Sequence, residues 1–237
     1  MTFAFSFARP SSFSSRLENL IASILSGAHG AAGGAPRHRL RVFVTVVAAA
    51  GAGYGLAMGA FGGITPDRWP QMLYAAVKVP LLLLATFGLG LPSFFVIHSL
   101  LGLRDDFSTA VRALLATQAG LTLVLLSFAP FTALVYASGM PYEWALLWNT
   151  AVFGLASASA QLLLRRYYRP LIQRNPKHRL MLRVWLGLYA FIGIQMGWLL
   201  RPFIGAPDTP TTFFRSGAWG NAYEQLWNIW VAAIGMN

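Results

Sequence analysis

Residues 79–103 read VPLLLLATFGLGLPSFFVIHSLLGL and contain no charged side chain. A helix needs about 20 mainly apolar residues to cross the hydrocarbon core of a bilayer, which is about 30 Å thick. This stretch is long enough, and its apolar residues do not alternate with polar ones as they would in a half-buried strand. It therefore predicts a membrane-spanning helix.

The rest of the chain repeats this pattern. Hydrophobic residues make up 56% of the 237 residues and charged residues only 11%, against the roughly 25% charged that is typical of soluble domains. The chain has no cysteine, which excludes a disulfide scaffold and a thiolate metal site. We expect an all-α integral membrane protein, a bundle of five transmembrane helices. The four other uncharged stretches are 42–66, 113–142, 144–164 and 184–200.

The basic residues predict how this bundle is oriented. The formal net charge is +11, and most of the 18 Lys and Arg residues lie before residue 42, between 103 and 113, or between 164 and 184. With five spans these segments share one side of the membrane, and Lys and Arg favour the cytoplasmic side. We therefore expect a multi-pass protein of the bacterial cytoplasmic (inner) membrane, with its N-terminus in the cytoplasm and its C-terminus outside.

The two ends of the chain predict interfacial segments. In the cytoplasmic tail 1–41, residues 15–27 begin with a capping-box pattern and continue with apolar residues at helical spacing, which is typical of an amphipathic helix on the membrane surface. A docking helix for a partner is the alternative. The five-helix domain is expected over 42–204, followed by an outer-face region, 205–237. There 223–235 predicts an interfacial or re-entrant helix, with a sixth crossing as the alternative.

No signature of catalysis or of a cofactor is present in the sequence. The chain lacks the zinc-protease, nucleophile-elbow, Walker and dinucleotide-binding patterns, and no set of His and carboxylate residues has the spacing of a metal site. We expect neither an enzyme nor a cofactor. The basic residues flank the spans instead of lining one soluble face, so nucleic acid is not an expected partner.

A few residues inside or beside the spans are candidate structural or ligand sites. Pro92 and Pro130 interrupt the hydrogen bonding of their helices, and broken helices form binding sites in transporters, whereas in a static bundle they only kink the helix. Polar groups in spans either line a polar path through the membrane or join helices by hydrogen bonds. The candidates are Lys78, Pro92, His98, Pro130, Glu143, Asn149, Gln195 and Arg201.

Three of these candidates have specific expected roles. Residues 70–78 predict a short surface helix that breaks near Pro80, which leaves Lys78 at the outer boundary, either snorkelling, paired, or binding an anionic headgroup or substrate. His98 is expected to be a hydrogen-bonded interfacial histidine or, alternatively, a proton-coupling group. Arg201 is expected to pair with a carboxylate, and the candidates are Glu143, Asp67 and Asp208.

Glycines spaced by four residues mark faces on which helices approach closely. Gly51, Gly55 and Gly59 form two such steps in the first span, and Gly193 and Gly197 form one in the fifth. The partner of each face is either another helix of this chain or a neighbouring subunit.

Three stretches carry a resemblance to a known family. They are YGLAMGAF (54–61), KVPLLLLATFGLGLPSFFVIHSLLG (78–102) and WLLRPFIGAPDTP (198–210) followed by FFR. They resemble an uncharacterised family of bacterial polytopic inner-membrane proteins, and the span count and layout are loosely similar to the five-span Yip1-like membrane proteins. That second resemblance implies a role in membrane organisation and partner binding.

Two functions are compatible with these features. The first is a non-catalytic membrane protein that acts as an accessory subunit or organiser of a larger membrane assembly, with lipids and protein partners or further copies of itself around it. The alternative is a transporter or channel for a small molecule, an ion or a lipid, built on broken helices around Pro92 and Pro130.

Overall fold

The computed structural model describes residues 36–206, 209–215 and 223–224, and the expected helix in the N-terminal tail and all but the first two residues of the one over 223–235 fall outside this range. The described residues form helices and no strand. The helices in chain order are α2 (Pro36–Gly59), α3 (Trp69–Leu100), the short 3-10 helix η1 (Arg104–Asp106), α4 (Phe107–Ala137), α5 (Tyr142–Arg174) and α6 (His178–Leu199).

Five of the helices are long and apolar enough to cross a membrane, and they indicate a multi-pass membrane protein. Their outer surface is also apolar: Leu89, Leu147 and Phe191 are each more than half exposed. Such side chains face hydrocarbon at no cost when the bundle lies in a bilayer. The sequence prediction of five apolar helices is therefore confirmed.

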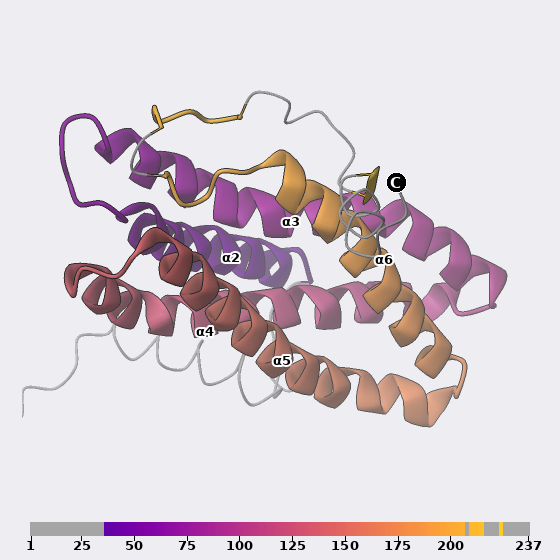
Figure 1. The fold of residues 1–237 in the computed structure, drawn as a ribbon. Helices are drawn as coiled ribbons and strands as arrows, with labels where there is room; N and C mark the ends of the chain where they lie inside the picture. The colour runs from indigo at the N-terminus through magenta and orange to yellow at the C-terminus, as the bar shows by residue number, and fades with distance from the viewer. Residues whose placement is uncertain (1–35, 207–208, 216–222, 225–237) are drawn as a thin grey trace, which may run out of the picture.

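The helices alternate in direction, so the bundle has two different ends (Figure 1). We call the end where α3 and α5 begin the strap end, and the end where α5 and α6 meet the basic end. Helix α2 packs on α3 and α4, α5 packs on α4, and α6 packs on α3. Helices α5 and α6 converge at the turn 174–178 and separate towards the strap end (Figure 1).

The expectation of a helix break near Pro80 is wrong. Helix α3 begins at Trp69 with proline in its first turn, where a missing N–H costs nothing, and it continues through Pro80 and Pro92 to Leu100. Residues 70–78 are therefore part of one long helix. The chain leaves this helix through Gly102 at φ +74, a conformation that glycine adopts without strain.

The glycine face of α2 is a contact within the chain. A Cβ atom on Gly55 would lie 2.3 Å from the backbone oxygen of Ala75, and one on Gly59 would lie 2.7 Å from that of Gln71. Gly51 meets Pro80 at an ordinary 3.4 Å. In α6, by contrast, among the described residues Gly193 touches only a methyl group of Thr86, and no neighbour lies within 4 Å of a carbon added to Gly197. The first glycine series therefore brings α2 against α3, and the second does not make a close contact.

We expect Gly55→Ala to destabilise the protein by about 1–3 kcal/mol, the usual cost of overpacking, because the backbone of α3 must move away from the new methyl group. Thermal unfolding of the purified protein in mild detergent measures the effect. The matched control is Gly154→Ala in α5, where no atom of another described element lies within 4 Å of the added carbon. Equal melting temperatures for the two variants would contradict this account of the contact.

Candidate functional site

After Leu199 the chain turns back along α3 as a non-helical segment, residues 200–206 and 209–215, which we call the strap (Figure 1). Three side chains from one face of α3 and its N-cap donate hydrogen bonds to strap carbonyls. Lys78 Nζ lies 2.6 Å from the oxygen of Pro202, Gln71 Nε2 lies 2.8 Å from that of Phe203, and Arg68 Nη2 lies 2.7 Å from that of Gly205. The strap is therefore fixed to α3 through its backbone.

Lys78 does not snorkel, because its side chain is fully buried. Its ammonium group donates to Pro202 and lies 4.9 Å from the centre of the Phe213 ring, so both partners come from the strap. Of the expected roles, the structure shows pairing, and the partner is a backbone carbonyl. A hydrogen bond from a charged donor to a carbonyl is stronger than one from a neutral donor.

The strap approaches α3 closely at Gly205. A Cβ atom at this position would lie 3.2 Å from both Arg68 Nη2 and Gln71 Cγ, tighter than side chains normally pack. The absence of a side chain therefore lets both donors reach their carbonyls. Further along the strap, Phe213 packs edge-on against Tyr74 with their ring centres 5.4 Å apart.

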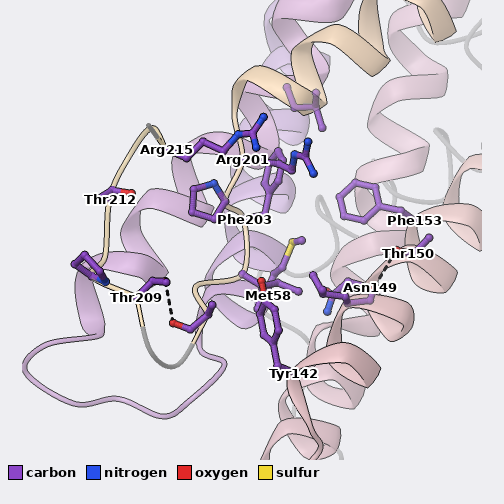
Figure 2. Close-up of a pocket in the computed structure, with 16 residues that line it drawn as sticks. Met58, Tyr142, Asn149, Thr150, Phe153, Arg201, Phe203, Thr209, Thr212 and Arg215 are labelled. Carbon is purple, nitrogen blue, oxygen red and sulfur yellow. Dashed lines mark hydrogen bonds between the residues drawn. The ribbon is translucent and has the colours of Figure 1, made fainter. Parts of the chain in front are cut away.

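A pocket of about 810 Å³ lies between the strap and α5 (Figure 2). Volumes of this size are typical of small-molecule sites. The described residues that line it include two arginines and no carboxylate. The lining residues are Met58, Leu82, Tyr142, Leu146, Asn149, Thr150, Phe153, Arg201, Pro202, Phe203, Ile204, Ala206, Thr209, Pro210, Thr212 and Arg215.

The two arginines stack on the same aromatic side chain. The guanidinium carbons of Arg201 and Arg215 lie 3.8 Å and 4.0 Å from the centre of the Trp198 ring, so they are at most about 8 Å apart and repel each other. Burial and the neighbouring Arg215 lower the pKa of Arg201, although an arginine remains charged at neutral pH. Among the described residues, Nε of Arg215 is buried without a hydrogen-bond partner.

The expected carboxylate partner of Arg201 is not found among the described residues. No ion pair joins Arg201 to Glu143 or Asp67, and Glu143 is exposed at the start of α5. Asp208 lies outside the described residues. Arg201 is held instead by its stacking on Trp198, since guanidinium groups stack well on indole rings.

Asn149 joins three helices at the pocket wall. It accepts a hydrogen bond from the hydroxyl of Tyr54 in α2 at 2.8 Å and donates to the hydroxyl of Tyr136 in α4 at 2.6 Å and to the carbonyl of Ala145 at 2.7 Å. Beside it, Trp148 donates to Thr132 at 3.0 Å. Polar groups in spans were expected to join helices or line a path, and Asn149 does join helices.

His98 lies at the basic end, as expected, but the expected hydrogen bond is missing. Neither ring nitrogen of this buried side chain has a partner among the described residues. Its ring centre lies 4.7 Å from that of Phe94 and 5.6 Å from that of His178. His98 is therefore packed in an aromatic environment at the end of α3.

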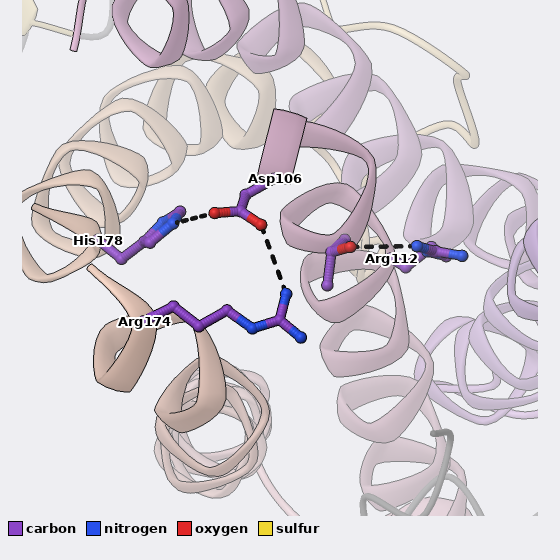
Figure 3. A network of polar contacts seen from close by, with 5 residues as sticks. Asp106, Arg112, Arg174 and His178 are labelled. Atoms are coloured by element: carbon purple, nitrogen blue, oxygen red, sulfur yellow. Dashed lines mark hydrogen bonds and ion pairs between the residues drawn. The ribbon is translucent and has the colours of Figure 1, made fainter. Parts of the chain in front are cut away.

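The turn between α5 and α6 is fixed to the turn between α3 and α4 (Figure 3). Asp106 lies 3.1 Å from Nε2 of His178 and 3.7 Å from Nη1 of Arg174, and Lys177 Nζ donates to the carbonyl of Leu101 at 3.2 Å. These contacts hold the basic end together, opposite the pocket.

The remaining candidates lie away from the pocket lining. Pro92 and Pro130 are exposed on the outside of α3 and α4, and both helices continue through them. The broken helices assumed by the transport hypothesis are therefore absent from α3 and α4. Gln195 is half-buried in α6.

Three residues of this site were missed from the sequence: Arg68, Gln71 and Arg215. Arg68 and Gln71 lie on the same helical face as Lys78, and this spacing in the sequence could have indicated that the three side chains act together. Nothing in the sequence pairs Arg215 with Arg201, because the strap brings them together only after it folds back.

Comparison with known proteins finds no matching family model, no matching curated relative and no matching solved structure. The geometry of the pocket is therefore the basis for the functional argument.

We expect Lys78→Met to loosen the strap, because a hydrogen bond from a charged donor contributes about 1.5–3 kcal/mol. Amide hydrogen exchange in the strap should become roughly ten to a hundred times faster, while exchange in α4 is unchanged. The control is Lys177→Met, which removes a similar bond at the basic end and should leave the strap as it is. Unchanged exchange in Lys78→Met would show that the strap is held by other contacts.

We expect Asn149→Leu to lower the free energy of unfolding by about 1–3 kcal/mol, because it leaves the buried hydroxyl of Tyr54 without its acceptor. The melting temperature in detergent measures this loss. In the adjacent control, Thr150→Val, the lost hydroxyl is exposed and bonds only to its own helix. Equal melting temperatures for the two variants would show that the hydrogen bonds of Asn149 do not stabilise the fold.

Proposed function

We propose that this chain is a non-catalytic multi-pass protein of the bacterial cytoplasmic membrane that binds an anionic ligand in the pocket under the strap. One observation carries the proposal: two arginines, Arg201 and Arg215, line a pocket in which no described lining residue is acidic. Two positive side chains near each other favour the binding of an anion beside them, since it relieves their repulsion and accepts their hydrogen bonds.

Three other polar groups of the pocket support binding over chemistry. Asn149 uses its amide to join helices, and Thr150 and Thr209 donate to backbone carbonyls of nearby residues. A nucleophile needs a neighbouring base to activate it, and these hydroxyls are paired with carbonyls. In this proposal the protein acts as an accessory subunit or organiser of a larger membrane assembly, and the ligand or its lipid environment links it to that assembly.

The proposed orientation follows from the charges of the two ends. Most basic residues of α5 and of the turn after it lie at the basic end, and this supports a cytoplasmic location for that end by the preference of Lys and Arg for the inner side. The N-terminus is then cytoplasmic, and the strap and its pocket face the outer side.

The test is ligand-dependent thermal stabilisation of the purified full chain, titrated separately with inorganic phosphate and with a short-chain phosphatidylglycerol. A ligand at a hundred times its Kd stabilises the folded state by about 2.7 kcal/mol. We expect at least one anion to raise the melting temperature of the wild type and to have no such effect on the double variant Arg201→Ala/Arg215→Ala.

The control for this experiment is Arg169→Ala, which removes an exposed arginine near the far end of α5 and should respond like the wild type. Equal responses of the wild type and the double variant to both anions would refute the proposed site.

A further inference from the structure

We infer that the ligand of this pocket is a membrane lipid with a phosphate headgroup, which enters sideways from the bilayer over the exposed side of α5. This inference rests on the function proposed above and specifies its ligand. It combines three observations: the size and lining of the pocket, the position of its rim, and the pairing of the two guanidinium groups.

The pocket is far larger than a free anion needs. Its volume of about 810 Å³ is in the range of sites that enclose a whole organic ligand. Much of its wall is apolar and comes from three helices: Met58 of α2, Leu82 of α3 and Phe153 of α5. An inorganic anion would leave this wall in contact with water, whereas a lipid places its chains against it.

The lining residues on α5 run from Tyr142, the first residue of the helix, to Phe153. At 1.5 Å per residue they extend over about 16 Å of the helix axis, which is half the thickness of a hydrocarbon core of about 30 Å. A ligand that fills this length has a chain as well as a headgroup.

The rim of the pocket opens on the surface of a candidate membrane-spanning helix. Leu146 and Thr150 both line the pocket and are exposed on α5, with 42% of Leu146 accessible. Residues exposed on a helix inside a bilayer contact lipid. A lipid chain that lies against this side of α5 in the bilayer can therefore reach the pocket.

The headgroup chemistry follows from the arginines. Figure 2 shows the side chains of Arg201 and Arg215 next to each other at one end of the pocket. The two unesterified oxygens of a lipid phosphate each accept several hydrogen bonds, so one phosphate can bind both guanidinium groups. Lys78 does not compete for this anion, because its ammonium group is bonded to Pro202.

The test separates the lipid from its soluble headgroup. The full chain is purified in detergent, and its Kd is measured by thermal shift for a long-chain phosphatidylglycerol and for glycerol phosphate. The variant Leu146→Trp narrows the rim and leaves both arginines in place. We expect it to weaken lipid binding by about tenfold or more and to leave the Kd of glycerol phosphate within twofold of the wild type.

The matched control is Leu147→Trp, since Leu147 is also exposed on α5, at 58%, but does not line the pocket. It should bind the lipid as the wild type does. Native mass spectrometry of the protein in phosphatidylcholine nanodiscs doped with phosphatidylglycerol should likewise show one retained anionic lipid in this control and a loss of that lipid in Leu146→Trp.

Two results would overturn the lipid inference while leaving the proposed function intact. One is binding of glycerol phosphate to the wild type as tightly as the lipid, with both lost in Arg201→Ala/Arg215→Ala. The other is equal lipid affinity in Leu146→Trp and Leu147→Trp. If no anion binds in a way that depends on the arginines, both the inference and the proposed function fail.

Discussion

Non-helical backbone beside membrane helices is stable only where its carbonyl and amide groups find partners inside the protein, because hydrocarbon offers none. The strap meets this requirement through donors from α3. Lys78, Gln71 and Arg68 each bond a different strap carbonyl between residues 202 and 205, and the strap in turn forms one wall of the pocket. The same bonds therefore stabilise an irregular segment and define the shape of the candidate site.

The close contact of α2 with α3 supports this arrangement from the other side. With Gly55 and Gly59 against its backbone, α3 has one face packed on α2, while another face carries the strap donors. Helix α5 is connected to these helices by packing on α4 and by the hydrogen bonds of Asn149. Helices α5 and α6 meet at the turn 174–178, which is held against the turn between α3 and α4, and they separate towards the strap end (Figure 1).

The number of spans and their approximate positions could be predicted from the sequence, because gaps between charges directly reflect the thickness of the bilayer. The same reasoning failed at Lys78. A charge was taken as the end of a span, but the ammonium group is buried against a carbonyl and an aromatic ring from the strap. Proline was taken as a break at Pro80, yet α3 continues through it.

The candidate site was harder to predict, because it joins residues that are distant in the sequence. Asn149 and Arg201 were singled out, but the partner of Asn149 in α2 is 95 positions away. The proximity of Arg201 and Arg215 depends on Trp198 and on the path of the strap. Such arrangements follow from tertiary structure, and a hydropathy pattern contains no information about them.

Lys78 and the two arginines have different roles, and this affects how the charge of the pocket responds to pH. The amine of Lys78, the cation here that can lose its proton most readily, is committed to holding the strap. The pocket itself is left with guanidinium groups, which stay ionised in any aqueous medium a cell encounters. The positive charge that the pocket presents should therefore stay the same when the surroundings become more acidic.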